Sequence, residues 1–363
     1  MNACVSSYGI TRVNKRSRWR INCIMMGNEI HQNRAVTLKY LAPGAVDAYL
    51  AKCGDRVACV VGFGSNPVAT TKSGCPLLWV DTPVLGSDAA YEVWTCNKPV
   101  SQYQDELITG AGNEDVFFGR LSFSNNVAAD LSEVALRAFS GIFEFLQRSD
   151  YSNLIRVWNY FPEINAVKNN IERYRSFSIG RHEAFVRYHK RVEDSPAACA
   201  LGSHGGALVI YFLASRSFGV QIENPRQISA YSYPKQYGPR SPTFSRATLA
   251  FPDAVQTLFI SGTASIVGHE TVHPVSVSLQ TQETLVNIHA VIEQAVLKGF
   301  APVDFASNLA LKVYVRHAQD FAEVVDIIQR EFGTLSELIV LQADICRADL
   351  LVEIEAVCWN HAR

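Results

Sequence analysis

The sequence has little net charge, no closely paired cysteines and no hydrophobic run long enough to span a membrane. Its 33 basic and 34 acidic side chains leave a formal net charge of -1, so no overall field draws the chain to nucleic acid or to an anionic membrane. No apolar run approaches the roughly 18 to 20 residues of a membrane span, and the N-terminus lacks the apolar core of a signal peptide. We therefore expect a cytoplasmic protein without a membrane or nucleic-acid partner. Any anionic ligand must then be held by local arginines.

The nine cysteines are odd in number, scattered along the chain, and form no C-x-x-C pair. This usage fits free thiols in a reducing compartment better than a disulfide framework. A chain of 363 residues that is 48% hydrophobic can bury a sizeable core, as one large domain or as two or three smaller ones.

Two N-terminal stretches differ in composition from the remainder. Residues 1–26 are basic without clear periodicity, which indicates a disordered tail or a start codon placed too early rather than a nucleic-acid-binding arm. Residues 27–115 contain short apolar runs broken by Gly, Pro and Ser, such as Arg56–Phe63, and we expect a β-rich region there.

The last third of the chain alternates between strand and helix patterns. Leu285, Ile288 and Ile292 recur at helical spacing, and Gly299 follows as a C-terminal cap. The predicted order is strand 256–266, helix 282–297, strand 311–316, helix 321–332 ended by Gly333, and strands 338–346 and 350–357. Such an order predicts an α/β fold in which helices cover one face of a sheet.

The middle of the chain repeats this order. It reads as strand 116–124, helix 132–148, strand 154–161, a helical stretch from Asn165, and strands 197–202 and 207–215. We interpret the repeat as an internal duplication that divides the chain into a first module, residues 116–225, and a second module, residues 226–363.

Several segments resemble known families. The runs Leu258–Gly262, Gln280–Ile288 and Val352–Ala356 resemble the Rid/YjgF family of small trimeric α/β proteins, and residues 156–162 and 195–206 are similar to it more loosely. The segment Tyr231–Arg240, together with Gly262, Cys346 and Glu353, resembles the chorismatases more specifically. These are chorismate-cleaving enzymes built on Rid-like modules. The resemblance covers residues 115–363 and implies duplicated modules, each a mixed β-sheet with helices on one face, and chorismate as the small-molecule substrate.

The last predicted strand carries two carboxylates on one face, because Glu353 and Glu355 are two residues apart. An exposed, solvated pair is the alternative interpretation. We expect Ile210 to occupy the position of Glu353 in the first module, so the fold itself does not require a carboxylate there. The resemblance implies that Glu353 is the general acid that protonates the enolpyruvyl group, and a closed pocket would raise its pKa as that role requires.

A dicarboxylate substrate needs arginine partners, since guanidinium matches the planar carboxylate and stays charged. Arg240 is the first candidate, with Arg181 and Arg246 behind it, and a surface charge is the alternative for each. Tyr233 and Tyr237 are candidates to hydrogen-bond a carboxylate, with a position in the core as the alternative.

Two small residues bear on the product. Gly262 can mark a bulge or a close backbone approach, and Cys346 can be an ordinary buried thiol. The resemblance implies more, because glycine and a cysteine seven residues before the glutamate accompany the chorismatases that form 3-hydroxybenzoate, some with 4-hydroxybenzoate as well. Hydrolytic members have alanine at the cysteine position and release a dihydroxylated diene. The implied reaction yields pyruvate and uses no metal or organic cofactor.

One motif points elsewhere. Residues 269–273 match the H-E-x-x-H pattern of zinc proteases, but that chemistry needs both histidines one turn apart on a helix. The motif follows a predicted strand and precedes Pro274, so we do not expect a zinc site.

Two other functions stay open at this level: a Rid-type enamine or imine deaminase, and a Rid-like module that binds a small molecule without reaction. A deaminase or binder of that family would be a trimer. Duplicated modules favour a monomer with internal pseudo-symmetry, with a trimer as the alternative.

Overall fold

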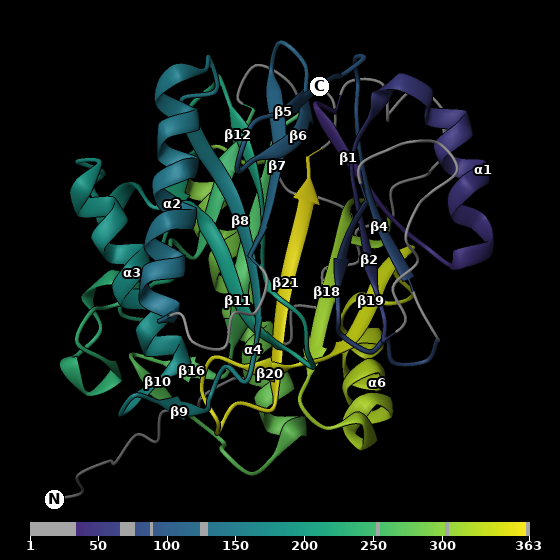
Figure 1. Cartoon of the computed structure of the whole chain (residues 1–363). Coiled ribbons are helices and arrows are strands. Elements are labelled where there is room, and N and C mark those ends of the chain that lie inside the picture. The colour runs from purple at the N-terminus through teal and green to yellow at the C-terminus, as the bar shows by residue number, and fades with distance from the viewer. Residues whose placement is uncertain are drawn as a thin grey trace, which may run out of the picture.

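The computed structural model describes residues 34–65, 77–87, 90–123, 130–251, 255–301 and 305–360. Three β-sheets enclose a common core, and helices cover their outer faces (Figure 1). The predicted α/β class is confirmed. The basic tail, residues 1–26, lies outside the described residues.

The first module forms most of a seven-stranded sheet. The strand order is β20 (Asp344–Ile345), β11 (Ala197–Ser203), β8 (Asn153–Pro162), β12 (Leu208–Ser215), β7 (Val116–Phe123), β6 (Thr109–Gly112) and β5 (Ser101–Gln104). Helices α2 (Leu131–Arg148) and α3 (Arg173–Arg187) pack side by side on one face, which an aromatic cluster including Phe139, Phe143 and Phe177 seals. Asp130 caps α2 by accepting a hydrogen bond from the Ser132 amide at 3.0 Å.

The second module forms a six-stranded sheet. Its strand order is β13 (Val220–Ile222), β14 (Ala247–Ala250), β15 (Thr257–Ala264), β21 (Val352–Trp359), β18 (Leu309–Val315) and β19 (Glu337–Gln342). Helices α4 (Val277–Leu297) and α6 (Phe321–Phe332) cover its outer face, and α5 (Phe305–Asn308) is a single turn. Gly299 and Gly333 take φ values of 97° and 75° just past α4 and α6, as expected of residues that end helices.

The two modules share one topology, which confirms the duplication. In the first, β7 pairs with β12, β12 with β8, and β8 runs parallel to β11. In the second, β15 pairs with β21, β21 with β18, and β18 runs parallel to β19. The predicted boundaries at residues 115 and 225 stay predictions, since β5 and β6 extend the first sheet and β13 extends the second.

The N-terminal region adds a third sheet. Its order is β1 (Val36–Leu41), β4 (Ala90–Cys96), β2 (Val57–Phe63) and β3 (Leu77–Val80), with α1 (Pro43–Cys53) on the outside. The described part of residues 27–115 holds strands β1 to β6 and the single α-helix α1. All residues of β2 and β4 are buried, because α1 covers one face of this sheet and the other two sheets cover the opposite face.

Three sequence-based expectations need correction. The helical stretch expected from Asn165 begins only at Arg173, because Asn169 and Asn170 adopt φ values of 51° and 63° and turn a small hairpin of β9 (Val167–Lys168) and β10 (Ile171–Glu172). The strand expected over 338–346 ends at Gln342, and β20 pairs instead with β11 of the other sheet.

The third correction concerns register. Ile210 packs among residues under α2 and α3, whereas Tyr211 belongs to the core between the sheets. Side chains alternate between faces, so Ile210 cannot be the counterpart of the inward-facing Glu353. The counterpart of Glu353 on β12 is instead one of the residues that face the central core, such as Val209 or Tyr211.

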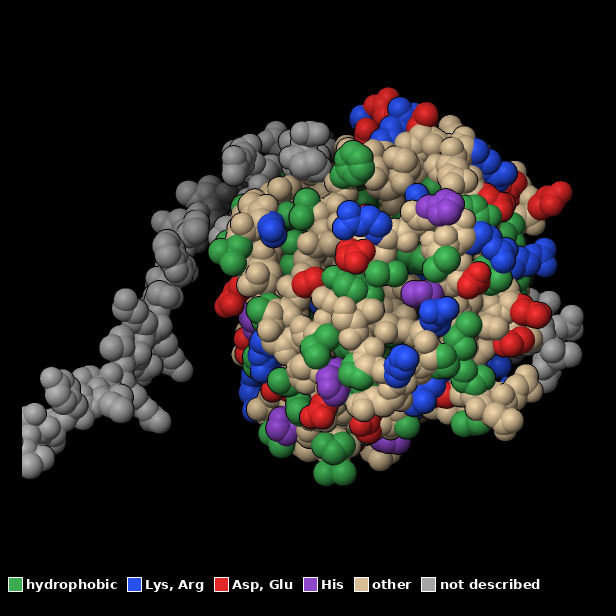
Figure 2. Space-filling model, turned by 90° about the vertical axis from the view of Figure 1, so that its left-hand side faces the viewer, with side chains coloured by type: hydrophobic (Ala, Val, Ile, Leu, Met, Phe, Trp, Pro, Cys, Tyr) green, Lys and Arg blue, Asp and Glu red, His purple; other side chains and the backbone are tan. Residues whose placement is uncertain are grey.

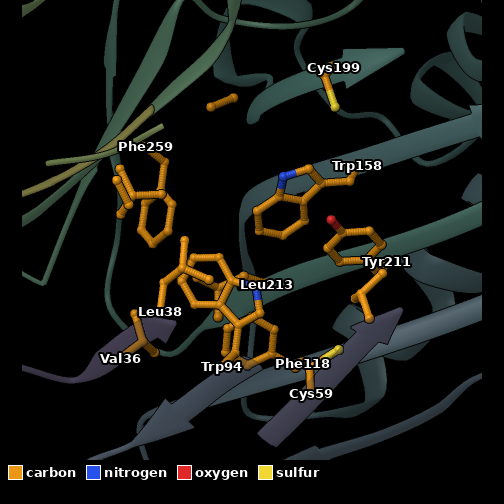
Figure 3. Close-up of a cluster of buried hydrophobic side chains, with 14 of the residues drawn as sticks. Val36, Leu38, Cys59, Trp94, Phe118, Trp158, Cys199, Tyr211, Leu213 and Phe259 are labelled. Carbon is orange, nitrogen blue, oxygen red and sulfur yellow. The ribbon is translucent and has the colours of Figure 1, made fainter. Parts of the chain in front are cut away.

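The central core draws aromatic side chains from all three sheets (Figure 3). The Trp94 ring of β4 lies with its centroid 5.6 Å from that of Trp158 on β8 and 6.2 Å from that of Phe259 on β15. Because all three sheets share one core, none of them buries its inner face without the other two.

The remaining elements are short. A second hairpin joins β16 (Ile266–Val267) to β17 (Glu270–Thr271), and 3-10 turns lie at Gly54–Arg56, Val192–Asp194, Ala230–Ser232, Lys235–Tyr237 and Ala318–Asp320. Cys53, Cys96, Cys199, Cys346 and Cys358 are free thiols. Within those ranges no helix is both long and apolar enough to cross a membrane. On the face in Figure 2, basic and acidic side chains are intermingled.

Candidate active site

A cavity of about 350 Å³ opens where the second sheet meets α3, the segment before β14 and the connection between β20 and β21. A narrow extension of about 30 Å³ continues inward between α3 and β11. Six residues line both spaces: Tyr174, Pro242, Phe244, Gly262, Cys346 and Glu353. The three residues predicted to act on the substrate are therefore brought together at the junction of the cavity and its extension.

Glu353 lies near the start of β21, between Ala264 on β15 and Tyr314 on β18. It is 4% exposed, and among the described residues its carboxyl has no hydrogen-bond or ion-pair partner. Burial raises the pKa of Glu353 to about 8, and the nearby Glu355 carboxylate adds to this while Arg156 opposes it. Glu353 can therefore hold a proton at neutral pH, unlike the solvated pair that was the alternative interpretation.

Gly262 faces this carboxyl across the β15–β21 pair. The register of the pair shifts between Ile260 and Thr263, which gives Gly262 the irregular backbone expected of a strand glycine. A Cβ atom at residue 262 would overlap the Glu353 carboxyl and lie 3.2 Å from the Cys199 Cβ. The absence of a side chain at 262 is therefore what leaves room for the acid.

Two thiols border the acid. Cys346 follows β20 and is half-buried, and its enclosed position raises the pKa of its thiol to about 12, with the Glu353 charge as a further cause. Cys199, on β11, is buried and lines the inner extension, and burial raises the pKa of its thiol well above the ordinary value. Both are neutral thiols at physiological pH rather than thiolate nucleophiles. Sequence reasoning missed Cys199, since only the fold brings β11 beside β15.

Arg181 projects from α3 into the inner extension. It is 4% exposed, its guanidinium carbon lies 4.8 Å from the Phe139 ring centroid, and its Nε and Nη2 atoms have no partner among the described residues. Burial lowers the pKa of Arg181 to about 10, so it is still charged at neutral pH. A buried cation with unused donors is a place for an anion.

Arg246 and Arg347 line the outer cavity. Arg246 donates to the Tyr233 hydroxyl and to the Ile228 carbonyl, each at 2.8 Å, and its Nε has no partner among the described residues. Arg347 donates to the His269 carbonyl at 2.8 Å and keeps a buried Nη2 without a partner in the same ranges. Sequence reasoning gave Arg347 no role, although it adjoins Cys346.

Tyr233 and Tyr237 shape the outer wall. The Arg347 guanidinium carbon lies 4.0 Å from the Tyr237 ring centroid and 5.2 Å from that of Tyr233. Both tyrosines line the cavity, so they hold Arg347 by cation–π contact rather than belonging to the core alone.

Arg240, the first candidate from sequence, lies elsewhere. It is exposed and lines neither the cavity nor its extension. The geometry favours Arg181, Arg246 and Arg347 as the cations that face a ligand.

The H-E-x-x-H motif is not helical. Glu270 and Thr271 form β17, and His273 adopts a φ of 59°. His269 instead shares a hydrogen bond of 3.1 Å with the Tyr237 hydroxyl through its Nδ1. In the described parts of the chain no three His, Cys, Asp or Glu side chains are grouped to hold a metal ion.

Comparison with known proteins adds independent findings. The family profile described as chorismatase FkbO/Hyg5-like, N-terminal, matches residues 92–214. A 3-hydroxybenzoate synthase of Streptomyces hygroscopicus is 37% identical over 316 residues, covering 84% of this chain and 92% of that protein. A chorismatase of Streptomyces rapamycinicus is 37% identical over 296 residues, covering 78% and 86% respectively. A crystal structure of a chorismatase superposes with a TM-score of 0.82 at 31% identity, covering 89% of this chain and 98% of that one.

Proposed function

The chain belongs to the chorismatase family, and on that premise we propose that it is an enzyme that converts chorismate to 3-hydroxybenzoate and pyruvate with Glu353 as the general acid. The observation that carries this proposal is a buried carboxyl, without a partner among the described residues and with its pKa raised to about 8 by burial, at the junction of a cavity that has unused arginine donors at both ends. A dicarboxylate whose reacting group lies between its charges fits that arrangement.

The chemistry begins at the enol ether of the substrate. Glu353 donates its proton to the terminal methylene carbon, and the adjacent carbon becomes an oxocarbenium-like centre that an oxygen atom attacks. The ether link then breaks on one side of its oxygen, at the bond either to the pyruvyl carbon or to the ring carbon, and pyruvate leaves. A carboxyl poised near neutral pH suits this step, because it is protonated before the reaction and a stable anion after it.

The substrate carboxylates call for charged donors. Arg181 serves the inner end of the site, and Arg246 and Arg347 serve the outer end. In each case the ligand would complete hydrogen bonds that the buried guanidinium leaves open, so binding removes a desolvation cost already present in the free protein.

Product choice depends on water. Chorismate divides into 3-hydroxybenzoate and pyruvate without net uptake of water, whereas hydrolysis to the dihydroxylated diene consumes one molecule. Cys346 and Gly262 line the space beside the acid, where they set both its volume and its polarity. We assign them the control of which oxygen attacks; 4-hydroxybenzoate is a second aromatic product to be measured.

Purified protein incubated with chorismate should release pyruvate and 3-hydroxybenzoate in equal amounts. Pyruvate is followed by coupled reduction with NADH, and the aromatic acids by chromatography. If neither pyruvate nor an aromatic acid forms at any pH from 5 to 9, the assignment is wrong and a binding function takes its place.

Replacing the thiol should redirect the product. We expect Cys346→Ala, and more so Cys346→Ala with Gly262→Ala, to raise the yield of the dihydroxylated diene while pyruvate release persists, because the smaller apolar side chain changes proton transfer and the space for water. The added Cβ at 262 also forces the Glu353 carboxyl to turn, so the double variant should be slower as well. Pyruvate and aromatic acid are quantified separately. A strictly proportional fall in both would make Cys346 a packing residue.

Chelation should have no effect. The proposed steps need an acid and an enclosed pocket rather than a metal-bound hydroxide, so dialysis against EDTA should leave the rate of pyruvate release unchanged. Stoichiometric zinc, lost together with activity and absent from a His269→Ala variant, would contradict this.

A further inference from the structure

Four charged side chains from all three sheets meet in one buried network, which we call the charge-balanced network: Glu92 of β4, Arg156 of β8, Lys312 of β18 and Glu355 of β21. Lys312 forms ion pairs with Glu92 and, at 2.9 Å, with Glu355, and Arg156 forms an ion pair with the other oxygen of Glu355. None of the four is more than 4% exposed.

Aromatic side chains complete the hydrogen bonds of the network. Trp94 and Tyr211 donate to Glu92 at 2.6 and 3.1 Å, and Tyr314 donates to Glu355 at 3.0 Å. Lys312 also donates to the Tyr211 hydroxyl at 2.9 Å. Such support keeps charged groups ionised in a place where isolated charges would be strongly disfavoured.

The network is neutral without Glu353. Two cations and two carboxylates balance, and Glu353 is the next side chain on the same face of β21 after Glu355. Burial would by itself raise the pKa of Glu355, but Lys312 and then Arg156 outweigh it and hold the pKa below its ordinary value. An ionised Glu353 would therefore be a fifth charge for which this network has no unpaired cation left, and in a buried site that charge is costly.

We propose that the charge-balanced network, acting together with burial, keeps Glu353 protonated, and that Glu92 on the N-terminal sheet is for this reason a positioning residue for the reaction. The N-terminal sheet then has a chemical role besides its packing role. This inference rests on the proposed function only where Glu353 donates its proton to the substrate. The protonation of Glu353 itself can be measured without substrate.

The remaining ionisable groups around Glu353 set the background against which the network acts. They lie on α3, β11, β18, the segment before β14 and the β20–β21 connection: Tyr174, Arg181, Cys199, Tyr314, Tyr233, Arg246, Cys346 and Arg347, with Glu172, Arg175, Glu270 and Asp349 at the outer wall. The variants that test this network alter none of these groups.

The first test changes the far end of the network. Glu92→Gln keeps the shape of the side chain but removes one negative charge, so the network becomes net positive and favours ionised Glu353. We expect the carboxyl titration of Glu353 to move to lower pH by about 0.5 to 1 unit, as for a single charge acting through a protein interior. The titration is followed by the infrared band of the protonated carboxyl, assigned by subtraction of the Glu353→Gln spectrum.

The second test removes a charge of the opposite sign from the network. Lys312→Met removes one positive charge and should move the same titration to higher pH. The double variant Glu92→Gln with Lys312→Met is neutral again and should titrate close to wild type. The double variant also provides the measurement if either single variant fails to fold, since a buried ion pair can often be replaced as a pair.

In an active enzyme the pH profile of kcat/KM must follow the infrared titration, with the fall at high pH moving in the same direction. A merely structural role would lower thermal stability without moving either curve. Unshifted titrations in folded variants, or shifts of the same sign for Glu92→Gln and Lys312→Met, would overturn the inference. Absence of pyruvate release with shifted infrared titrations would instead refute the proposed function alone.

Discussion

Glu353→Gln is expected to reduce the rate of pyruvate release by roughly a hundredfold or more, the scale usual for loss of a general acid. The amide has the same shape and cannot donate a proton to carbon. Circular dichroism and thermal unfolding should show an intact fold, and the loss should appear in kcat more than in KM. A variant that retains more than a tenth of wild-type turnover would remove Glu353 from the role of acid.

The raised pKa of Glu353 fixes the expected pH dependence. The acid must be protonated to act, so activity should fall as pH rises through about 8. Stability follows the same direction, because a carboxyl with a pKa of about 8 in the folded state and near 4.5 in the unfolded state loses its contribution as pH rises between those values. Glu353→Gln has no such proton, and its melting temperature should drop less than that of wild type between pH 5 and pH 8.

The control for this variant must lie off the network. Glu355 shares a face with Glu353 but forms ion pairs with Arg156 and Lys312, so its replacement would leave buried cations unpaired and threaten folding. Glu323, exposed on α6, is the matched control, and Glu323→Gln should retain full activity.

Arg181→Met is expected to raise KM for chorismate roughly a hundredfold, the cost of removing one partner of a buried, hydrogen-bonded charge pair. Its effect on the free protein should have the opposite sign. Arg181 buries a charge with two nitrogens that have no partner among the described residues, so an apolar side chain of similar length should leave the melting temperature unchanged or raise it. A buried cation without partners in this way increases the affinity of the site for an anion and lowers the stability of the free protein.

Arg240→Met provides the matched control, since Arg240 is exposed and outside the cavity. We expect its KM to stay within about twofold of wild type, the range usual for surface substitutions. A large rise for Arg240→Met with none for Arg181→Met would instead support the order of candidates taken from sequence.

Strand periodicity predicted the part of the site that lies on regular structure. Alternation on β21 places Glu353 and Glu355 on one inward face, as period-two reasoning predicted. Periodicity did not place Gly262, because the register of β15 shifts there and Ala264 is the residue paired with Glu353; only the family resemblance brought the glycine to the acid. Period-two reasoning failed by one residue at Ile210. All residues of β12 are apolar or buried, so the sequence does not show which of them face the central core and which face the helices.

Residues outside regular elements could not be placed in this way. Arg240 and Arg246 lie in one irregular segment with no period, and only the fold turns Arg246 inward and leaves Arg240 exposed. Arg347 and Cys199 enter the site through contacts between distant parts of the chain, for which a single sequence carries no signal.

The two-residue strand β20 has a consequence for how this enzyme can change over generations. Ile345 is held in register with Leu201, so the next residue, Cys346, emerges at a fixed point regardless of its side chain. On the proposed assignment, mutation at 346 changes the side chain that faces the substrate ring, while β20 still holds the backbone in place. On the proposed role of Cys346, single codon changes at this position can therefore alter product selectivity, at a cost in stability limited to the packing of one small side chain against the two cores.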